Sequence, residues 1–385
     1  MLNYPDFGNV TPDTTERNPH FRSVVHYVNP DILVTQENAS SSSSNMFLNY
    51  VMNSNVAGQY TAGTYINGFD TDNAIYFLTG QFNFISNTPI HTALRDINAF
   101  KLVHLLSGDT IIIYSCHLKA SAGPPNDSLR NKEVGLLRQV TNALPAGTDF
   151  IICGDFNTYS DVEPCYLSLL QDNSTDDGNF VDPIHLTGTW NQFAYRSYHT
   201  QSTRRRSFGN GSTGGMDDRF DMILFSTAVS APGRITYVPN STVPIGNDGN
   251  HYNDSINQVP NFAVPLAVAN ALHYASDHLP VTANFNFTVV TGVDNLTKDQ
   301  LHFNIYPNPA TEKITVSYSL KVAARISMSV VDVAGKTIMQ FTPMQQFEGY
   351  HENQNIDVSN LNPGIYMVKL TAENFIINRK LIIMK

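Results

Sequence analysis

The sequence predicts a layered α/β sandwich followed by a small all-β sandwich. Two observations predict the larger part: short apolar runs that end in polar clusters, and segments with helical apolar spacing between them. Runs of this length are typical of buried strands, and strands that alternate with helices build layered sheets. A third observation is the series of short alternating strands after residue 303. At 385 residues the chain suits two domains. We expect them at 1–290 and 304–385, joined by a polar linker at 291–303.

The first predicted element is a helix over residues 14–28. Its apolar residues recur at helical spacing, namely Phe21, Val24, Val25 and Val28. Pro30 breaks the helix, and the apolar run 31–34 predicts a strand that leads to Glu37. The serine run 40–44 predicts a loop or the polar start of another helix.

The remaining elements of the larger domain follow from apolar runs, helical spacing and clusters of turn residues. We expect antiparallel strands near 68–79 and 94–106, strands at 111–114, 150–153, 220–225 and 279–290, helices at 126–144 and 162–170, and long loops over 172–217 and 227–275. The all-β sandwich is predicted from strands that begin at Lys313, Ile326, Ile365 and Leu381, with Gly-containing turns between them.

The composition limits the function classes. Charged residues make up 15% of the chain, hydrophobic residues 42%, and the net charge is −10. A polar surface built from Asn, Ser, Thr and Gln is common in extracellular proteins. An acidic chain lacks the basic field of a dedicated nucleic-acid binder, although carboxylates that bind a metal contribute to this sign. Three cysteines give no complete disulfide framework, and neither a membrane span nor a signal peptide is visible.

Polar clusters lie at the ends of the apolar runs, at 36–37, 115–118, 154–157 and 276–279. Such strand ends are where sites are built in layered α/β proteins. The clusters supply two carboxylates, an Asp-x-Asn, an Asp-His and a separate His. This set is what metal-assisted hydrolysis of a phosphoester requires.

Asp155 and Asn157 would point to the same side of an extended segment. The carboxylate would then act on an attacking water while the amide orients the phosphate or a metal-bound water. Gly154 would let the backbone approach its neighbour closely. A plain Gly-Asp turn after a strand is the structural alternative, and it is the more common one for this motif alone.

Glu37 is a candidate ligand for a hard cation, since such ions prefer carboxylate oxygens. Asp277 and His278 would point in different directions, the first as a metal ligand and the second to hold phosphate or exchange protons. A histidine in that role needs an orienting carboxylate, and Asp221 is the candidate. An exposed Glu and an ordinary Asp at a strand start are the structural alternatives.

His117 ends a strongly apolar strand, where a structural histidine is the common outcome. Asp72, with Asn73, is the candidate to orient it, and Asp72 is also a candidate substrate-binding residue. Arg95 is a candidate to bind phosphate, with a surface ion pair as the alternative. The basic run 204–206 predicts a solvated loop tip more than a contact with a polyanion.

Taken in order, Gln-Glu, His-Leu, Gly-Asp-x-Asn, Arg-x-Asp and Ser-Asp-His resemble the endonuclease/exonuclease/phosphatase superfamily over nearly all of residues 1–288. The resemblance implies a four-layered α/β sandwich and Mg²⁺-dependent hydrolysis of phosphoesters, with Mn²⁺ or Ca²⁺ as alternative ions. The resemblance implies that Glu37 binds the metal and that Asp277 completes the metal or base cluster. It implies that Asp155 aligns or deprotonates the water, with support from Asn157. It also implies that His278, paired with Asp221, holds the scissile phosphate and that His117 is the second active-site histidine.

The superfamily opens with a strand that ends in a metal-binding Asn. Residues 1–8 resemble the segment just after it, so we expect that strand, and a signal peptide, upstream of Met1. Asn3 is expected to lie in the loop that follows the strand.

The tail resembles the type IX secretion C-terminal sorting domain, through Tyr-Pro-Asn-Pro at 306–309 and Asn-Pro-Gly-Ile-Tyr at 362–366. This resemblance implies export across both membranes of a gram-negative, Bacteroidetes-type cell by the type IX machinery. The protein would be secreted or held at the cell surface, with the tail removed.

Three functions remain open at this point. The leading hypothesis is a secreted Mg²⁺-dependent nuclease or phosphodiesterase that digests external nucleic acid. A phosphatase or a phospholipase C-type enzyme, similar to sphingomyelinases, would use the same chemistry on a lipid or a small phosphate ester. An inactive surface-binding module is the third. The retained polar set argues against it: Glu37, Asp155, Asn157, Asp221, Asp277 and His278. The aromatic residues of 190–198 would stack on bases or pack the loop.

Overall fold

The computed structural model describes residues 3–5, 17–173, 175–206, 211–289, 303–320, 324–347, 349–372 and 375–385. The chain divides into two compact units, Met1–Thr288 and Val289–Lys385. The expected linker lies outside the described residues except at Phe303, and so do residues 14–16 of the first predicted helix. Within the described ranges, no helix has the length and apolarity needed to cross a membrane.

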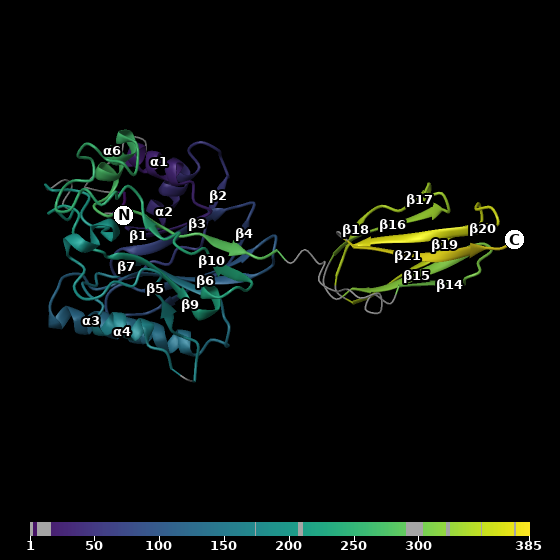
Figure 1. The fold of residues 1–385 in the computed structure, drawn as a ribbon, viewed down its shortest axis with the longest axis horizontal. Helices are drawn as coiled ribbons and strands as arrows, with labels where there is room; N and C mark the ends of the chain where they lie inside the picture. Colours follow the sequence, from purple (N-terminus) through teal and green to yellow (C-terminus); the bar gives the residue numbers. More distant parts are fainter. Residues whose placement is uncertain are drawn as a thin grey trace. The chain divides into compact units, whose positions relative to one another are not determined.

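Two sheets occupy the centre of the first unit (Figure 1). The smaller sheet has the order β1-β3-β2, with β1 at Ile32–Asn38, β2 at Tyr60–Ala62 and β3 at Asp72–Leu78. The larger sheet has the order β4-β5-β6-β7-β9-β8, with bounds Phe82–Ile90, Ile97–His104, Thr110–His117, Phe150–Asp155, Asp221–Ser226 and Phe180–Val181. Strands β6 and β7 are parallel, while β7 and β9 are antiparallel.

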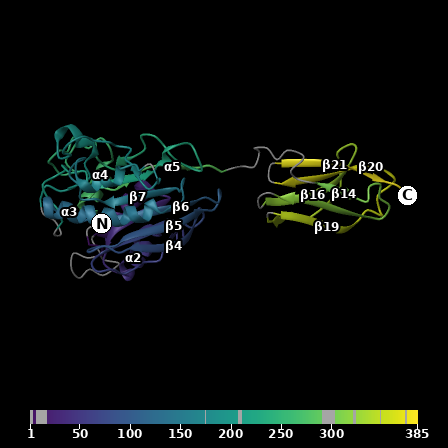
Figure 2. The ribbon, with the colours of Figure 1, turned by 90° about the horizontal axis from the view of Figure 1, so that it is seen from below.

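Helices cover the outer face of each sheet, which gives four layers (Figures 1 and 2). On the side of the smaller sheet lie α1 (Arg17–Val28), α2 (Ser41–Phe47) and α6 (Leu266–Ala275). On the side of the larger sheet, α3 (Pro124–Asn142) and α4 (Pro164–Leu170) pack against each other. Short turns complete the unit: a π-helical turn at Leu48–Met52, a 3₁₀ turn at Phe193–Tyr198 and α5 at Thr227–Ser230. The predicted four-layered α/β sandwich is confirmed.

Strand β6 shows why its sequence is a continuous apolar run. Ile111 and Ile113 pack into the core between the two sheets, while Tyr114 and Cys116 pack into the core beneath α3 and α4. Successive side chains alternate between faces, so a strand covered on both sides carries apolar residues at consecutive positions, as at 111–114. Packing on both faces holds β6 in place, and this fixes the position of its last residue, His117.

Two expectations for the larger domain need correction. The strand expected over 279–290 is broken into β12 (Val281–Thr282) and β13 (Phe285–Phe287), which pair with β11 (Val243–Pro244) and β10 (Ile235–Tyr237). The stretch 227–275, expected to be loops, contains α6. This helix was not predicted because its own apolar residues lie on all sides of the helix, so they form no single apolar face.

The second unit is a β-sandwich of two antiparallel sheets. One has the order β14-β15-β19, with bounds Asn304–Tyr306, Lys313–Leu320 and Gly349–Asp357. The other has the order β17-β16-β20-β21, with bounds Thr337–Gln340, Ala324–Asp332, Gly364–Ala372 and Phe375–Ile383, and β18 (Met344–Gln346) pairs with β16. Inward side chains such as Val316, Val330 and Val368 form its core. Strand β19 was not predicted because its centre, His-Glu-Asn-Gln-Asn, is polar.

Gly154, near the end of β7, tests how tightly β6 and β7 approach. Its φ is +138°, and a Cβ added there would lie 2.0 Å from the carbonyl oxygen of Cys116. We expect Gly154→Ala to lower the free energy of unfolding by more than about 2 kcal/mol. Urea unfolding followed by the fluorescence of Trp190, the only tryptophan and a buried one, measures this.

Gly135→Ala on α3 is the matched control. An added Cβ there meets no atom within 4 Å, and alanine in a helix is favoured over glycine by about 0.5–1 kcal/mol. The control is expected to be slightly more stable than the parent chain. Equal unfolding midpoints for the two variants would contradict the close approach of the strands.

Candidate active site

The ends of three neighbouring strands of the larger sheet bring three candidate residues side by side. His117 ends β6 and Asp155 ends β7, and the two are register partners. Asp221 begins β9 and is the antiparallel partner of Asp155. Because these strands are buried on both faces, a slip of register would expose apolar side chains. The sheet therefore fixes the order His117, Asp155, Asp221 along one edge.

Glu37, near the end of β1, brings the smaller sheet to the same edge. Its Oε1 lies 3.8 Å from Nδ1 of His117, and its Oε2 accepts a hydrogen bond from the backbone nitrogen of Asn3 at 2.7 Å. The φ of Glu37 is +62°, a left-handed conformation that costs energy for a residue with a Cβ. The register of the pairing between β1 and β3 shifts between Thr35 and Asn38. The irregular backbone there turns the carboxylate of Glu37 toward His117.

His117 is buried and is held as a neutral imidazole. Burial lowers its pKa well below the ordinary value, and the charges of Arg95 and His278 act in the same direction. Its Nε2 lies 3.6 Å from Oδ2 of Asp155, and its Nδ1 has no hydrogen-bond partner among the described residues. The ring therefore keeps hydrogen-bonding capacity for a group that enters the site.

Asp155 and Asn157 meet through a turn rather than through an extended segment. The backbone nitrogen of Asn157 donates to Oδ1 of Asp155 at 2.9 Å, and Nδ2 of Asn157 donates to the carbonyl oxygen of Leu118 at 3.2 Å. The φ of Asn157 is +49° because β7 ends at Asp155 and the chain turns there. The expected same-side geometry is thus corrected. The pKa of Asp155 is raised to about 7, chiefly by burial; His278 opposes the rise, and Asp221 adds to it.

His278 is oriented by Asp221, as a carboxylate–histidine pair would require. Its Nδ1 lies 2.7 Å from Oδ2 of Asp221, and its Nε2 lies 3.8 Å from Oδ2 of Asp155. Burial alone would lower the pKa of His278, but Asp221 and Asp155 outweigh it and raise the pKa to about 10. The ring is therefore a cation at neutral pH. Gln201, which the sequence did not single out, places its amide nitrogen 2.6 Å from Nε2.

Asp277 precedes His278 but points elsewhere, as expected for neighbours at a strand edge. Its Oδ2 accepts a hydrogen bond from the backbone nitrogen of Ser212 at 2.7 Å. Burial would raise its pKa, but His278 and the Ser212 amide outweigh burial, and the pKa is lowered. The side chain is 4% exposed and stays ionised.

Arg95 reaches the site, but its guanidinium is already engaged. Its Nε donates to the carbonyl oxygen of His117 at 3.0 Å, its Nη2 to that of Leu118 at 3.2 Å, and its Nη1 to Asp70 at 3.2 Å. The arginine thus holds the backbone where β6 ends. Only the arm toward Asp70, whose carboxylate is half exposed, is free to exchange its partner for a phosphate.

Asp72 is not brought to His117. Its carboxylate accepts hydrogen bonds from the backbone nitrogen of Gly68 at 2.9 Å and from the hydroxyl of Tyr65 at 3.1 Å. Asn73 donates instead to Oδ1 of Asn98 at 2.8 Å. The start of β3 pairs with the end of β1, which turns Asp72 toward the loop that precedes β3.

Arg130, on the buried face of α3, ties together the two loops that follow His117 and Asn157. It donates to Oε2 of Glu163 through Nε at 3.1 Å and Nη2 at 2.9 Å, and to the carbonyl oxygens of Lys119 and Ser121 at 2.8 and 2.9 Å. The side chain is 0% exposed. The sequence carried a signal for it, since Arg130 lies one turn before Val134 on the apolar face of the helix.

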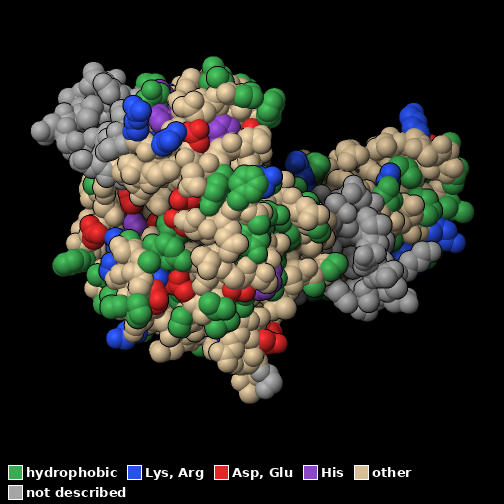
Figure 3. All heavy atoms as spheres, turned by 60° about the vertical axis from the view of Figure 1, so that its left-hand side comes forward, with side chains coloured by type: hydrophobic (Ala, Val, Ile, Leu, Met, Phe, Trp, Pro, Cys, Tyr) green, Lys and Arg blue, Asp and Glu red, His purple; other side chains and the backbone are tan. Residues whose placement is uncertain are grey.

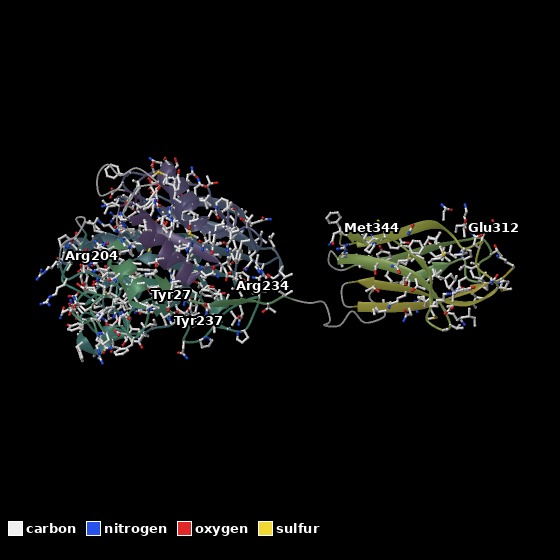
Figure 4. All side chains as sticks on the ribbon, turned by 90° about the horizontal axis from the view of Figure 1, so that it is seen from above. Tyr27, Arg204, Arg234, Tyr237, Glu312 and Met344 are labelled. Carbon is white, nitrogen blue, oxygen red and sulfur yellow. The ribbon has the colours of Figure 1, made fainter. Side chains whose placement is uncertain are left out.

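Arg204 corrects the expectation of a solvated basic tip. It is fully buried beside α6 (Figure 4) and donates through Nε to the carbonyl oxygen of His273 at 2.7 Å. Arg17 of α1 donates through Nε and Nη2 to the carbonyl oxygen of Ala275. Cations at a helix C-terminus are stabilising. The two arginines fix the end of α6, from which the chain runs directly to Asp277.

The donors at this edge fit a hard divalent cation. Glu37 and Asp277 offer carboxylate oxygens, the ligands that Mg²⁺ prefers. Among the described residues, no group of three or more His, Cys, Asp or Glu side chains could hold a metal ion by itself. Mg²⁺ is commonly bound through one or two carboxylates and completes its coordination with water and phosphate oxygens. Glu37 and Asp277 are the carboxylates that would hold such an ion, with its other positions left to water and phosphate oxygens.

Comparison with known proteins gives two family matches. The model described as Endonuclease/Exonuclease/phosphatase family matches residues 14–278, and the model described as Secretion system C-terminal sorting domain matches residues 304–384. No curated protein matches the chain.

Several solved structures are similar to the chain. TDP2 of D. rerio, complexed with a single-strand DNA product, has a TM-score of 0.47 and 16% identity, covering 72% of this chain and 96% of that one. The human Nocturnin catalytic domain with bound sulfate has a TM-score of 0.44 and 19% identity, covering 71% and 87%. An endonuclease/exonuclease/phosphatase family protein from Bacteroides thetaiotaomicron has a TM-score of 0.42 and 15% identity, covering 71% and 87%.

Arg130→Met tests whether the buried clamp holds the two loops. The change leaves Glu163 buried without its cation, which typically costs about 3–5 kcal/mol. We expect a loss of this size in urea unfolding followed by Trp190 fluorescence. Lys132→Met, at an exposed position of the same helix, is the control and should change stability by no more than about 0.5 kcal/mol. Similar stabilities of the two variants would show that the clamp is unimportant.

Proposed function

Because the chain belongs to the Endonuclease/Exonuclease/phosphatase family, we propose that it is an Mg²⁺-dependent phosphodiesterase that cleaves extracellular nucleic acid. Family membership makes it a phosphoester hydrolase, and the sorting domain at residues 304–384 makes it a secreted or surface protein. The metal, the nucleic-acid substrate and the roles of individual residues are the proposed parts.

The observation that carries the proposal is the meeting of a base and a cation at one strand edge. Asp155, with a pKa raised to about 7 by burial, lies 3.8 Å from the charged ring of His278. A base that titrates near neutral pH is suited to accept a proton from water. A fixed cation beside it is suited to hold the phosphate on which that water acts.

In the proposed reaction, Asp155 aligns the attacking water and accepts one of its protons. The water oxygen bonds to phosphorus in line with the leaving oxygen, whose bond to phosphorus breaks. His278, held by Asp221, hydrogen-bonds a phosphate oxygen as negative charge grows there. Asn157 fixes the carboxylate of Asp155 through its backbone nitrogen. Glu37 and Asp277 would hold Mg²⁺, which when bound neutralises charge on the phosphate oxygens.

The loop that contacts Asp277 supports a substrate with more than one phosphate. Arg205 and Arg206 are exposed, and the backbone nitrogen of Arg205 donates to Oγ of Ser255 at 2.8 Å. Ser212, six residues after Arg206 in the sequence, donates through its backbone nitrogen to Asp277. On the face in Figure 3, Lys and Arg side chains lie in separate groups among Asp and Glu. These two arginines would bind phosphates that neighbour the scissile one, so a polyanion could be held without a broad basic surface.

A phospholipase C-type activity is the second candidate, and exposed apolar side chains favour it. Val259 and Phe262 are 69% and 77% exposed on the loop before α6, and Phe193, at the start of the 3₁₀ turn, is 59% exposed. Exposed apolar side chains of this kind would contact the surface of a lipid aggregate.

The substrate is tested with the full chain and four substrates: plasmid DNA, RNA, bis-p-nitrophenyl phosphate and sphingomyelin vesicles. Each is incubated with Mg²⁺ and with EDTA. We expect cleavage of DNA or RNA and of the small diester, abolished by EDTA and restored by excess Mg²⁺. Hydrolysis of sphingomyelin in the vesicles, with no cleavage of DNA or RNA, would contradict the nuclease and support the phospholipase C-type activity. Turnover that persists in EDTA would contradict the metal.

Asp155→Asn tests the proposed base with little change of shape. The amide cannot accept a proton from water, so we expect kcat for the small diester to fall by roughly 10²-fold or more. Asp172→Asn, at an exposed position outside the site, is the control and should keep the parent kcat. A fully active Asp155→Asn variant would rule out the role of Asp155.

A further inference from the structure

The backbone of Gln201 is fixed between the two segments that carry Asp221 and His278. Its nitrogen donates to the carbonyl oxygen of Asp218 at 3.1 Å, and its carbonyl oxygen accepts from the nitrogens of Asp217 and Asp218 at 2.8 and 3.0 Å. It also forms antiparallel bridges with both His278 and Asp218. The neighbouring residue Thr200 accepts from the nitrogen of Leu279 at 2.8 Å. Gln201 is therefore held as firmly as a strand residue, and its side chain emerges inside the site.

The amide of Gln201 occupies the hydrogen-bonding position of His278 that faces the site. Nδ1 of His278 is engaged by Asp221, so Nε2 is the nitrogen left for a substrate, and the amide lies 2.6 Å from it. An amide fits either state of the ring: its nitrogen donates to a bare Nε2, and after a flip its oxygen accepts from Nε2–H. The contact is thus complementary in both cases.

A phosphate that binds His278 must compete with this amide. A hydrogen bond from an imidazole N–H to an anionic phosphate oxygen is roughly twice as strong as one to a neutral amide, so the phosphate takes the position. The displaced amide remains anchored beside it and carries two N–H donors. Gln201 is half-buried, which leaves its side chain room to turn toward an entering group.

We propose that Gln201 binds the scissile phosphate next to His278 and, being neutral, favours a singly charged phosphodiester over a doubly charged monoester. This inference rests on the proposed function, in which His278 holds the phosphate. The carboxylates of Asp155 and Asp221 already lie 3.8 and 2.7 Å from the ring nitrogens of His278. Each extra negative charge on the substrate is repelled there, and a neutral donor adds attraction without offsetting a second charge.

Charge changes at Gln201 provide the test. Glutamate would pair with His278 and repel phosphate, lysine would attract the second charge of a monoester, and methionine would keep the size but remove the donors. Gln139→Glu and Gln139→Lys, at an exposed position of α3, are the matched controls. Urea unfolding followed by Trp190 fluorescence establishes that each variant is folded before it is compared.

Steady-state kinetics on bis-p-nitrophenyl phosphate and p-nitrophenyl phosphate give the first measurement. We expect Gln201→Glu to raise KM for the diester by about tenfold or more, and Gln201→Met to raise it by a smaller factor, with kcat changed less than KM. Gln201→Lys should raise the ratio of monoester to diester kcat/KM by about tenfold. Diester KM values and ratios equal to those of the Gln139 variants would overturn the inference.

Calorimetric titration with inorganic phosphate separates this inference from the proposed function, because it requires no turnover. The affinity should fall in Gln201→Glu and rise in Gln201→Lys relative to the parent chain. A parent chain that binds phosphate but hydrolyses no diester would refute the proposed function alone. Equal phosphate affinity in the parent chain and both Gln201 variants, or no phosphate binding by the parent chain, would overturn the role of Gln201.

Discussion

The pairing of β7 with its two neighbours is the constraint on which the site depends. Parallel pairing with β6 and antiparallel pairing with β9 place His117, Asp155 and Asp221 in one row. The row exists because β6 and β7 come close enough at their ends that only glycine fits at position 154. Both faces of these strands are covered by apolar layers, so the register cannot slip without exposing the core. The chemistry is therefore positioned by packing far from the reacting groups.

Buried charge at this edge is arranged in opposing pairs. Asp221 and Asp155 stabilise the charged ring of His278, and that ring in turn limits the rise in the pKa of Asp155. Buried arginines hydrogen-bond the chain next to the site residues. Arg130 donates to the loop after His117, and Arg17 and Arg204 donate to the end of α6, just before Asp277. Buried ions that are paired and hydrogen-bonded in this way are costly to break individually. Most of the buried charged groups at this edge are thus paired within the protein itself.

The sequence predicted the residues that lie at strand ends, because strand ends follow from local apolar runs. Asp155, His117 and Glu37 fall at this edge for that reason. Contacts that depend on how distant segments pack were not visible: Asp72 was expected beside His117, but the pairing of β3 with β1 turns it away. Gln201 lies in a segment with no periodic pattern, and the buried state of Arg204 depends on α6, which was itself not predicted. The turn at Asn157 was missed because two residues do not reveal where a strand stops.

The proposed mechanism requires that water attacks phosphorus and not the carbon of the leaving group, and oxygen labelling distinguishes the two. The full chain is allowed to hydrolyse bis-p-nitrophenyl phosphate in H₂¹⁸O with Mg²⁺, and the products are examined by mass spectrometry. Attack at phosphorus predicts that ¹⁸O enters p-nitrophenyl phosphate and is absent from p-nitrophenol. Label in p-nitrophenol would mean that the bond between carbon and oxygen breaks, and it would contradict the mechanism derived from this site.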